Sequence, residues 1–294
     1  MTYDLYIADR TFSSWSLRGW LMFAKFGIPV RTHVLGLYSG TFAEDMAPLA
    51  PARLVPVIRK PEGQVIGETL AIAETLAERH PDAGLWPEDA GARAHARWLV
   101  SEMHAGFGAL RGECPMQLIG QYRGFEVSTA VGADLARLEE LWASAAPYRT
   151  AGSPWLFGRY SLADVFYAPV AARIAGYRLP VGPEAGAYVK AHLGDEKFRQ
   201  WRAMGLTKSY DPVPYAMDLE QAEWPGPAPL AARAVEEGPA LNDTCPYSGK
   251  PVTHYLDLGG ETYGFCNAFC RDKTVADPEA WPLFVRMRRD LTGD

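Results

Sequence analysis

Two consecutive serines, Ser13 and Ser14, stand where an apolar run gives way to a helical pattern. Free backbone N–H groups at the start of a helix, together with a hydroxyl, favour an anion such as a carboxylate or a thiolate. Serines at this position also serve simply as N-caps, so the turn is either a structural cap or an anion site. The apolar run is YDLYIA, and the helical period is carried by Leu17, Trp20, Leu21 and Ala24.

No cysteine accompanies these serines, because residues 1–80 contain none. Thiol chemistry at the turn therefore needs a sulfur atom brought by a ligand. A free thiol with a pKa of about 8.5 is about 3% ionised at pH 7, and lowering that pKa by about two units takes about 2.7 kcal/mol. A hydrogen bond to a charged group contributes about 1.5–3 kcal/mol and a helix N-terminus about 0.3–1 kcal/mol, so one serine hydroxyl at the helix end is enough.

Two further features of the first eighty residues suit an acidic peptide. Pro56, in LVPV, heads a predicted strand where a proline lacks the N–H donor of a central ladder, and we expect a cis bond there. Glu68 and Thr69, in GETLAI, open a predicted helix, where free N–H groups favour a carboxylate. The serine turn, the proline and this acid–hydroxyl pair together outline a site for an acidic peptide.

Three of the four cysteines lie in the last fifty residues. Cys245 is followed after twenty residues by Cys266, and Gly259-Gly260, between these two cysteines, is a hairpin signal. Cys270 comes one helical turn after Cys266. Thiols on a turn and at the start of a helix can bind zinc or another soft ion. A segment this short holds a core poorly without a staple, which favours the metal. The alternative is that the three cysteines pack as small apolar side chains.

The elements that position these residues divide the chain into four predicted segments. Strand and helix patterns in the order β-α-β and β-β-α indicate a compact α/β unit, and an almost continuous helical pattern follows it. A stretch rich in proline, glycine and acid then predicts a linker. The segments are residues 1–80 (α/β), residues 88–206 (all-helical), residues 207–243 (linker) and residues 244–294 (a small module with three cysteines).

Composition argues against several classes of partner. The 294 residues carry 29 basic and 35 acidic side chains, a net charge of −6, and no basic stripe that would neutralise phosphates, so we expect no nucleic acid partner. We expect no membrane partner either, because no apolar run approaches spanning length. The beginning of the chain lacks a secretory pattern and the cysteines form no disulfide framework, which predicts a cytoplasmic protein.

With these features in this order, the sequence resembles the glutathione transferases. SSWSLR is similar to the SSCSxR turn of their zeta class, which includes maleylacetoacetate isomerases. The stretches AGLWPEDAGARAHAR, SEMHAGFGALR and SLADVFYAP look like a bacterial subgroup whose turn reads SSWS. The resemblance covers residues 1 to about 206. It implies a thioredoxin-like N-terminal domain, an all-α C-terminal domain and a homodimer.

The resemblance also implies glutathione as co-substrate and gives roles to the residues of the turn and its surroundings. Ser13 would donate a hydrogen bond to the glutathione thiolate and Ser14 would assist or position it. Thr69 would hold the γ-glutamyl carboxylate and Glu68 the γ-glutamyl amine. Val55 would pair its backbone with the cysteinyl part. The thiolate would then attack, or isomerise, a small electrophile.

A pocket for that electrophile is predicted beside the turn. Trp15 stands where the zeta pattern has cysteine, which indicates a changed pocket. His104 and Arg111 are seven residues apart on a predicted helix and share a face, so they are candidates to border the pocket with Met103 and Phe107. The alternative is that this face is simply solvated.

The tail resembles the TRASH and YHS metal-binding modules through CPYSGK, FCNAFC and ADPEAW. This implies a treble-clef or zinc-ribbon-like fold in which Cys245, Cys266 and Cys270 bind zinc or another soft ion. Ser248 stands where many members have a second cysteine, so the fourth ligand is His254, water or an open position. The chain is then a glutathione transferase-like enzyme with a metal-binding tail, or a non-catalytic scaffold that binds glutathione or a heavy metal.

Overall fold

A computed structural model describes residues 2–293. The chain forms two compact units. The first runs to Leu193 and also includes Met217–Pro225. The second comprises Gly194–Ala216 and the chain from Gly226 onward.

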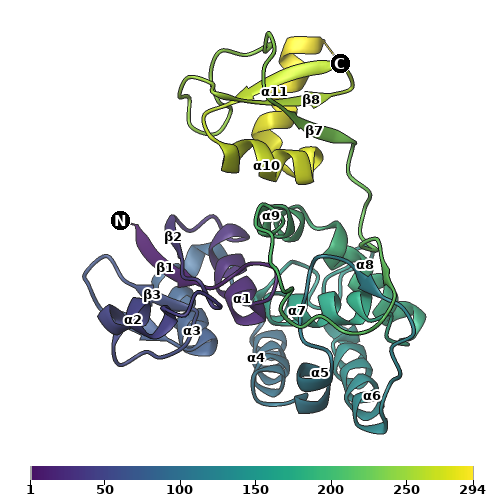
Figure 1. The fold of residues 1–294 in the computed structure, drawn as a ribbon. Coiled ribbons are helices and arrows are strands. Elements are labelled where there is room, and N and C mark those ends of the chain that lie inside the picture. The colour runs from purple at the N-terminus through teal and green to yellow at the C-terminus, as the bar shows by residue number, and fades with distance from the viewer. Residues whose placement is uncertain (1, 294) are drawn as a thin grey trace. The chain divides into compact units, whose positions relative to one another are not determined.

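The first unit begins with a four-stranded sheet in the order β2-β1-β3-β4. Strand β1 pairs in parallel with β2 and antiparallel with β3, and β3 pairs antiparallel with β4. A parallel pair needs a crossover, which helix α1 provides, and α1 and α3 lie beside the sheet (Figure 1). The elements are β1 (Tyr3–Ile7), α1 (Ser14–Ala24), β2 (Val30–Val34), α2 (Phe42–Met46), η1 (Ala47–Leu49), β3 (Val57–Arg59), β4 (Val65–Gly67), α3 (Thr69–Arg79) and η2 (Pro81–Ala83).

The rest of the first unit is helical. Helix α7 is buried on all sides and packs against both α1 and α4, so it connects the sheet-bearing part to the helices. Of the helices within residues 2–293, none has the length and apolar character needed to cross a membrane. The elements are α4 (Ala90–Ala105), α5 (Gly108–Glu113), β5 (Gln121–Tyr122), α6 (Thr129–Ser144), η3 (Ala146–Tyr148), α7 (Leu162–Gly176), α8 (Pro183–Gly194) and β6 (Gln221–Ala222), which pairs with β5.

The second unit is built on an antiparallel sheet in the order β7-β8-β9, with helix α10 after the last strand (Figure 1). Gly259 and Gly260 form the turn between β8 and β9 with φ of 66° and 89°, so the predicted hairpin is confirmed. The elements are α9 (Glu196–Gly205), β7 (Ala232–Val235), β8 (His254–Leu258), β9 (Glu261–Phe265), α10 (Ala268–Ala276), η4 (Pro278–Ala280) and α11 (Pro282–Thr292).

Besides residues 244 onward, this unit takes chain from two other predicted segments. Helix α9 was expected to end the helical domain of residues 88–206, but Arg199 on α9 donates two hydrogen bonds, of 2.8 and 2.7 Å, to the buried carboxylate of Asp277. Strand β7 lies inside the predicted linker of residues 207–243 and pairs with β8. Both differences arise because long-range contacts, which local composition does not encode, place these segments.

The second unit consequently has an apolar core of its own. The size argument for a metal staple therefore fails, because the unit is larger than fifty residues and contains several large buried side chains. The case for an ion depends on the geometry of the sulfur atoms alone. The core residues include Phe198, Trp201, Leu256, Tyr263, Phe265 and Phe284.

In the first unit, the core contains a histidine without polar partners. His192, on α8, is fully buried against the rings of Trp155, Tyr160 and Tyr188. Neither of its ring nitrogens has a hydrogen-bond partner among residues 2–293. Burial lowers the pKa of His192 to about 3, and the Lys25 ammonium adds to the effect. The imidazole therefore stays neutral in the folded unit where the unfolded chain would protonate it.

We expect the free energy of unfolding to decrease as the pH falls below about 6.5, because only the unfolded chain then binds a proton at this position. The loss approaches about 1.4 kcal/mol per pH unit and continues until the folded-state pKa of about 3 is reached. His192→Phe keeps the ring and removes the titration, so it should retain about 2 kcal/mol that the wild type loses between about pH 6.5 and 5. Urea unfolding at several pH values measures the difference.

His254→Phe is the matched control, because His254 is partly exposed at the start of β8. It should show the same pH dependence as the wild type. Parallel pH profiles for the wild type and His192→Phe would contradict the assignment.

Candidate functional site

The start of helix α1 is a buried chain of hydroxyl groups. Ser13 is the N-cap of α1 and its Oγ accepts a hydrogen bond from the backbone N–H of Ser16 at 3.3 Å. The Ser13 hydroxyl donates to Oγ of Ser16 at 2.7 Å, and this second oxygen also accepts from the backbone N–H of Ala8 at 2.9 Å. Ser13 therefore is the structural cap, and its hydroxyl belongs to a chain that ends at the backbone of residue 8.

Pro56 lies against helix α1 at Gly19. The Val55–Pro56 bond is cis, as predicted, and Val55 precedes strand β3. A Cβ on Gly19, in the middle of α1, would lie 2.7 Å from Cβ of Pro56. The absence of a side chain at Gly19 is thus what allows the cis-proline turn to lie against α1.

The acid–hydroxyl pair lies at the start of α3. Glu68 is exposed, with φ of 63°, and Thr69 is buried. A positive φ on a non-glycine residue is strained, and such strain gathers at functional sites. His104 on α4 lies beside both residues: its Nδ1 is 3.5 Å from Oγ1 of Thr69 and its Nε2 is 3.8 Å from a carboxylate oxygen of Glu68. Helix α4 therefore contributes to this part of the site.

Two buried guanidinium groups, those of Arg18 and Arg173, lie close to the serine turn. Arg18 on α1 is 1% exposed, and its Nε donates to the carbonyl of Phe166 on α7 at 3.1 Å. Its Nη1 is buried and has no hydrogen-bond partner within the described chain. Arg173 on α7 is also buried, with Nη2 3.4 Å from Oγ of Ser14 and Nε donating to the carbonyl of Cys114 at 2.9 Å.

Within residues 2–293, the charged groups that shift the pKa of Arg18 include no carboxylate. Burial lowers the pKa of Arg18, the like charges of Arg173 and Arg111 lower it further, and only Tyr167 raises it. A buried cation with an unmet N–H donor and cationic neighbours is an environment that an anion stabilises. The arrangement can therefore hold an anionic group next to Ser14.

Trp15 forms the partly exposed wall of this cationic region. The guanidinium of Arg18 lies 4.2 Å and that of Arg111 5.1 Å from the Trp15 ring centroid, and the ring of His104 meets Trp15 edge-on at 5.3 Å. The two distances from the guanidinium groups to the Trp15 ring are typical of cation–π contacts. Burial lowers the pKa of His104, Glu68 opposes this effect, and Arg18 and Arg111 reinforce it. The imidazole is thus kept neutral beside two cations.

The other two predicted pocket residues, Met103 and Phe107, are buried. Met103 is fully buried, and Phe107 is nearly so, with φ of 60° at the start of α5. Both side chains belong to the buried core, whereas Trp15, His104 and Arg111 are partly exposed and come together.

Three residues of this site were missed or misjudged in the sequence. Ser16 and Arg18 belong to the SSWSLR motif but were given no role from the sequence, and Arg173 carried no signal. The burial of Arg18 and Arg173 depends on α7, which follows α1 by more than a hundred residues in sequence, so no local pattern points to the buried pair of arginines.

The protein's own thiol near this site is inert. Cys114 is fully buried, and burial raises the pKa of its thiol to about 12, with only partial relief from Arg173. A thiolate that reacts at the α1 N-terminus therefore has to belong to a ligand.

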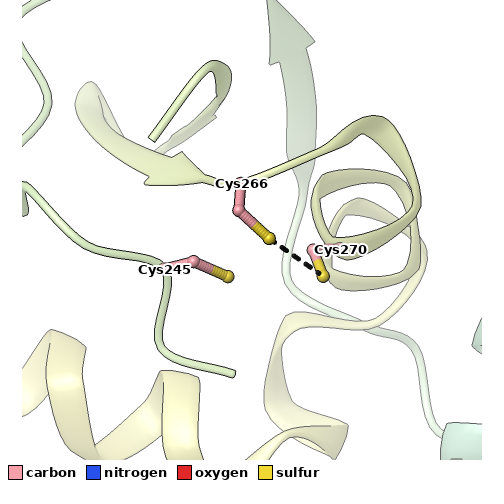
Figure 2. Close-up of side chains that lie close together, drawn as sticks. All are labelled: Cys245, Cys266 and Cys270. Atoms are coloured by element: carbon pink, nitrogen blue, oxygen red, sulfur yellow. Dashed lines mark hydrogen bonds between the residues drawn. The ribbon is translucent and has the colours of Figure 1, made fainter. Parts of the chain in front are cut away.

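A second candidate site lies in the second unit, where three cysteines converge. The sulfur atoms of Cys245, Cys266 and Cys270 all lie within 4.8 Å of one another, and Cys266 and Cys270 are 4.0 Å apart. Figure 2 shows the three side chains pointing toward one another, from a loop, from the end of β9 and from α10. Thiolates at about 2.3 Å from one zinc ion are about 4 Å apart, so the spacing fits a shared soft ion.

Local hydrogen bonds hold two of these cysteines in place. Residues 245–250 form a knuckle in which the N–H of Cys245 donates to the carbonyl of Lys250 at 2.8 Å and the N–H of Gly249 donates to the carbonyl of Cys245 at 2.9 Å. Asn267, the N-cap of α10, accepts from the N–H of Cys270 at 2.8 Å. Hydrogen bonds within the chain thus help to position Cys245 and Cys270.

The environments of the three sulfurs differ. Burial raises the pKa of the Cys245 thiol, but hydrogen bonds from Cys266 and the knuckle outweigh it and lower the pKa to about 7. Burial and then the charges of the other two cysteines raise the pKa of Cys270 to about 12. The cluster can therefore carry one thiolate easily and needs a positive charge to carry three.

His254, predicted as a fourth ligand, is not part of this cluster. Its Nδ1 lies 2.9 Å from Oγ1 of Thr253, and the metal-ligating atoms that the described residues bring together are the three sulfurs. The register pairs His254 with Phe265, one residue before Cys266, and strand residues alternate between faces. The hydroxyl of Ser248 is the nearer group, donating to Sγ of Cys266 at 3.2 Å.

Comparisons with known proteins bear on the first unit. Residues 12–79 match the family model of the glutathione S-transferase N-terminal domain. The chain is 28% identical over 183 residues to maleylacetoacetate isomerase of Rattus norvegicus, covering 61% of this chain and 81% of the rat protein. It is 33% identical over 117 residues to the probable maleylacetoacetate isomerase of Caenorhabditis elegans, covering 40% of this chain and 53%, about half, of that protein.

Among solved structures, a glutathione transferase homologue from Burkholderia with bound glutathione is similar in fold. The TM-score is 0.53 at 20% sequence identity, covering 71% of this chain and 100% of that one. The predicted thioredoxin-like N-terminal domain and helical domain are therefore confirmed at the level of the fold.

The contact between Gly19 and Pro56 yields a test of how the site is held. Gly19→Ala should lower the free energy of unfolding by about 1–3 kcal/mol, because its Cβ would lie 2.7 and 2.9 Å from two carbons of Pro56. Gly132→Ala, in α6, has no atom within 4 Å of its Cβ and should instead stabilise by about 0.5–1 kcal/mol. Urea unfolding checks both, and an equal effect of the two substitutions would refute the proposed contact.

Proposed function

Because residues 12–79 match the family model of the glutathione S-transferase N-terminal domain, we propose that the chain is a glutathione-dependent enzyme that acts on a small electrophile. Its support is the start of α1, where a buried hydroxyl chain, a cis-proline turn and the Glu68–Thr69 helix start belong to one unit. Glutathione lies along Val55–Pro56, with its γ-glutamyl amine at Glu68 and its γ-glutamyl carboxylate at Thr69. Its sulfur lies at Ser13.

The hydroxyl chain gives Ser13 a way to donate to that sulfur. A serine hydroxyl rotates to suit its partners. When Ser16 turns its O–H toward Oγ of Ser13, the Ser13 hydroxyl is released to donate to the thiolate, while the N–H of Ala8 continues to donate to Ser16. Each donor in such a chain polarises the next. The thiol proton leaves to solvent, and the helix N-terminus adds its partial positive charge.

The buried arginines define the second substrate. An electrophile with a carboxylate would place that group near Arg18 and Arg173, with its reactive carbon toward the thiolate and its apolar part against Trp15. Addition of the thiolate followed by protonation of the resulting carbanion from solvent gives a conjugate, whereas addition, rotation about the bond that was double and loss of the same thiolate return glutathione and leave an isomer. Isomerisation of an acid is the reaction named in the relatives of rat and nematode.

We propose further that the three cysteines of the second unit bind zinc or another thiophilic ion in a treble-clef-like module. The convergence of their sulfurs within 4.8 Å supports this. The ion would supply positive charge that lets all three sulfurs ionise together. Cys245, Cys266 and Cys270 would hold it.

Ser13→Ala should raise the pKa of the bound glutathione thiol by about one to two units, because it removes a hydrogen bond of about 1.5–3 kcal/mol to the thiolate. Turnover near pH 7 should fall by about 3- to 25-fold, as the ionised fraction of a thiol with a pKa of about 6.5 decreases, and recover at higher pH. Titration of the thiolate ultraviolet absorbance in the complex measures the pKa directly. Ser14→Ala is the control: Ser14 contacts Arg173, so it should leave the thiol pKa in place and raise KM for the electrophile. An unchanged thiol pKa in Ser13→Ala would overturn the assignment.

Zinc should bind with one ion per chain and stabilise the second unit, by about 2.7 kcal/mol at a hundredfold excess over Kd. Cys270→Ser should abolish this shift in the thermal unfolding midpoint and the bound zinc found by elemental analysis. Cys114→Ala removes a thiol outside the cluster and should retain both. Retention of one ion by Cys270→Ser would count against the site.

A further inference from the structure

The three-cysteine cluster leaves one position of a tetrahedral ion without a ligand from the protein. Soft ions take sulfur and imidazole ligands in preference to hydroxyls. Within residues 2–293, the cysteine, histidine and carboxylate groups that gather here are the three thiols. The fourth position is therefore filled from outside the chain, and this inference rests on the metal site proposed above.

Ser248 marks the open corner. Its Oγ donates to Sγ of Cys266 at 3.2 Å, and the same hydroxyl also forms a hydrogen bond with Cys245. A side chain that reaches two of the three sulfurs occupies the place from which a fourth cysteine would reach an ion. A hydroxyl there is a weak ligand, so it borders the position without closing it.

This corner faces solvent. Ser248 and the neighbouring Asn267 are exposed, and Cys266 and Cys270 are partly exposed, whereas Cys245 is buried. An external ligand can therefore approach from the Ser248 side and leave the knuckle undisturbed.

The charge around the cluster tolerates a further anion. Lys273, on the same helix as Cys270, has its ammonium 3.6 Å from the ring centroid of Tyr247 and 3.7 Å from that of Trp281. This fixed cation interacts electrostatically with Cys270. Cation–π contacts on two sides keep it in place, so it offsets part of the negative charge that a fourth thiolate would bring.

We propose that the fourth position takes the sulfur of an external thiol, and that glutathione is the thiol this chain would meet. On binding, the thiol loses its proton to solvent, its sulfur joins the ion, and one water molecule leaves. No electron is transferred and no covalent bond of the chain changes. The cluster is then an exchange site, because a mobile thiol that shares the ion with three cysteines can also carry the ion away or deliver it.

Cobalt(II) bound to the full-length protein is the probe, because its sulfur-to-metal charge-transfer band grows with the number of thiolate ligands. Glutathione should raise this band by about one third in the wild type, as three thiolates become four. S-Methylglutathione, which has the same peptide and no thiol, should leave it unchanged. Elemental analysis after gel filtration shows that the cobalt stays with the chain.

Two variants at one position separate the outcomes. Ser248→Cys supplies the fourth thiolate from the chain, so it should show the larger band from the start and no response to glutathione. Ser248→Ala keeps the corner open and should respond like the wild type. A cobalt-loaded wild type that ignores glutathione, or a Ser248→Cys variant that responds as strongly as the wild type, would overturn the proposal. Failure of the wild type to bind cobalt at all would instead refute the metal site itself.

Discussion

The position of helix α1 is the constraint on which the first unit depends. On one side, Gly19 brings the helix against the cis-proline turn, with no room for even a methyl group. On the other side, Arg18 donates from the same helix to a carbonyl of α7. The N-terminus of α1, with its hydroxyl chain, is therefore fixed by two contacts of opposite chemistry, one apolar and tight and one polar and buried.

This placement also explains why the site proposed above would favour an anion. Two guanidinium groups are buried around the start of α1, and neither burial nor the charge of Arg111 favours the cationic form of Arg18. A folded protein accepts such an arrangement when other interactions outweigh its electrostatic cost. An anionic ligand would lower this electrostatic cost when it binds. The decrease would contribute to the binding free energy of a carboxylate next to the sulfur.

The features predicted from sequence were those that local rules determine. The cis bond at Pro56 follows from a proline at the head of a strand, and the hairpin from two adjacent glycines between alternating strands. The burial of Arg18, the assignment of α9 to the second unit and the exclusion of His254 from the cysteine cluster depend on contacts between distant segments. A single sequence carries no periodicity for such contacts, and a charged residue on a helix looks the same whether water or another helix covers it.

The two units treat sulfur in opposite ways, and burial decides which. In the first unit, a lone buried thiol has its pKa raised to about 12, so Cys114 is a packing residue and a reactive sulfur has to be borrowed. In the second unit, burial acts on Cys245 as well, yet hydrogen bonds from the knuckle outweigh it and lower the pKa to about 7. A thiolate is thus available there near neutral pH, and its two neighbours need only the charge of an ion to join it. Backbone hydrogen bonds, more than exposure, distinguish a cysteine that can bind metal from one that only fills space.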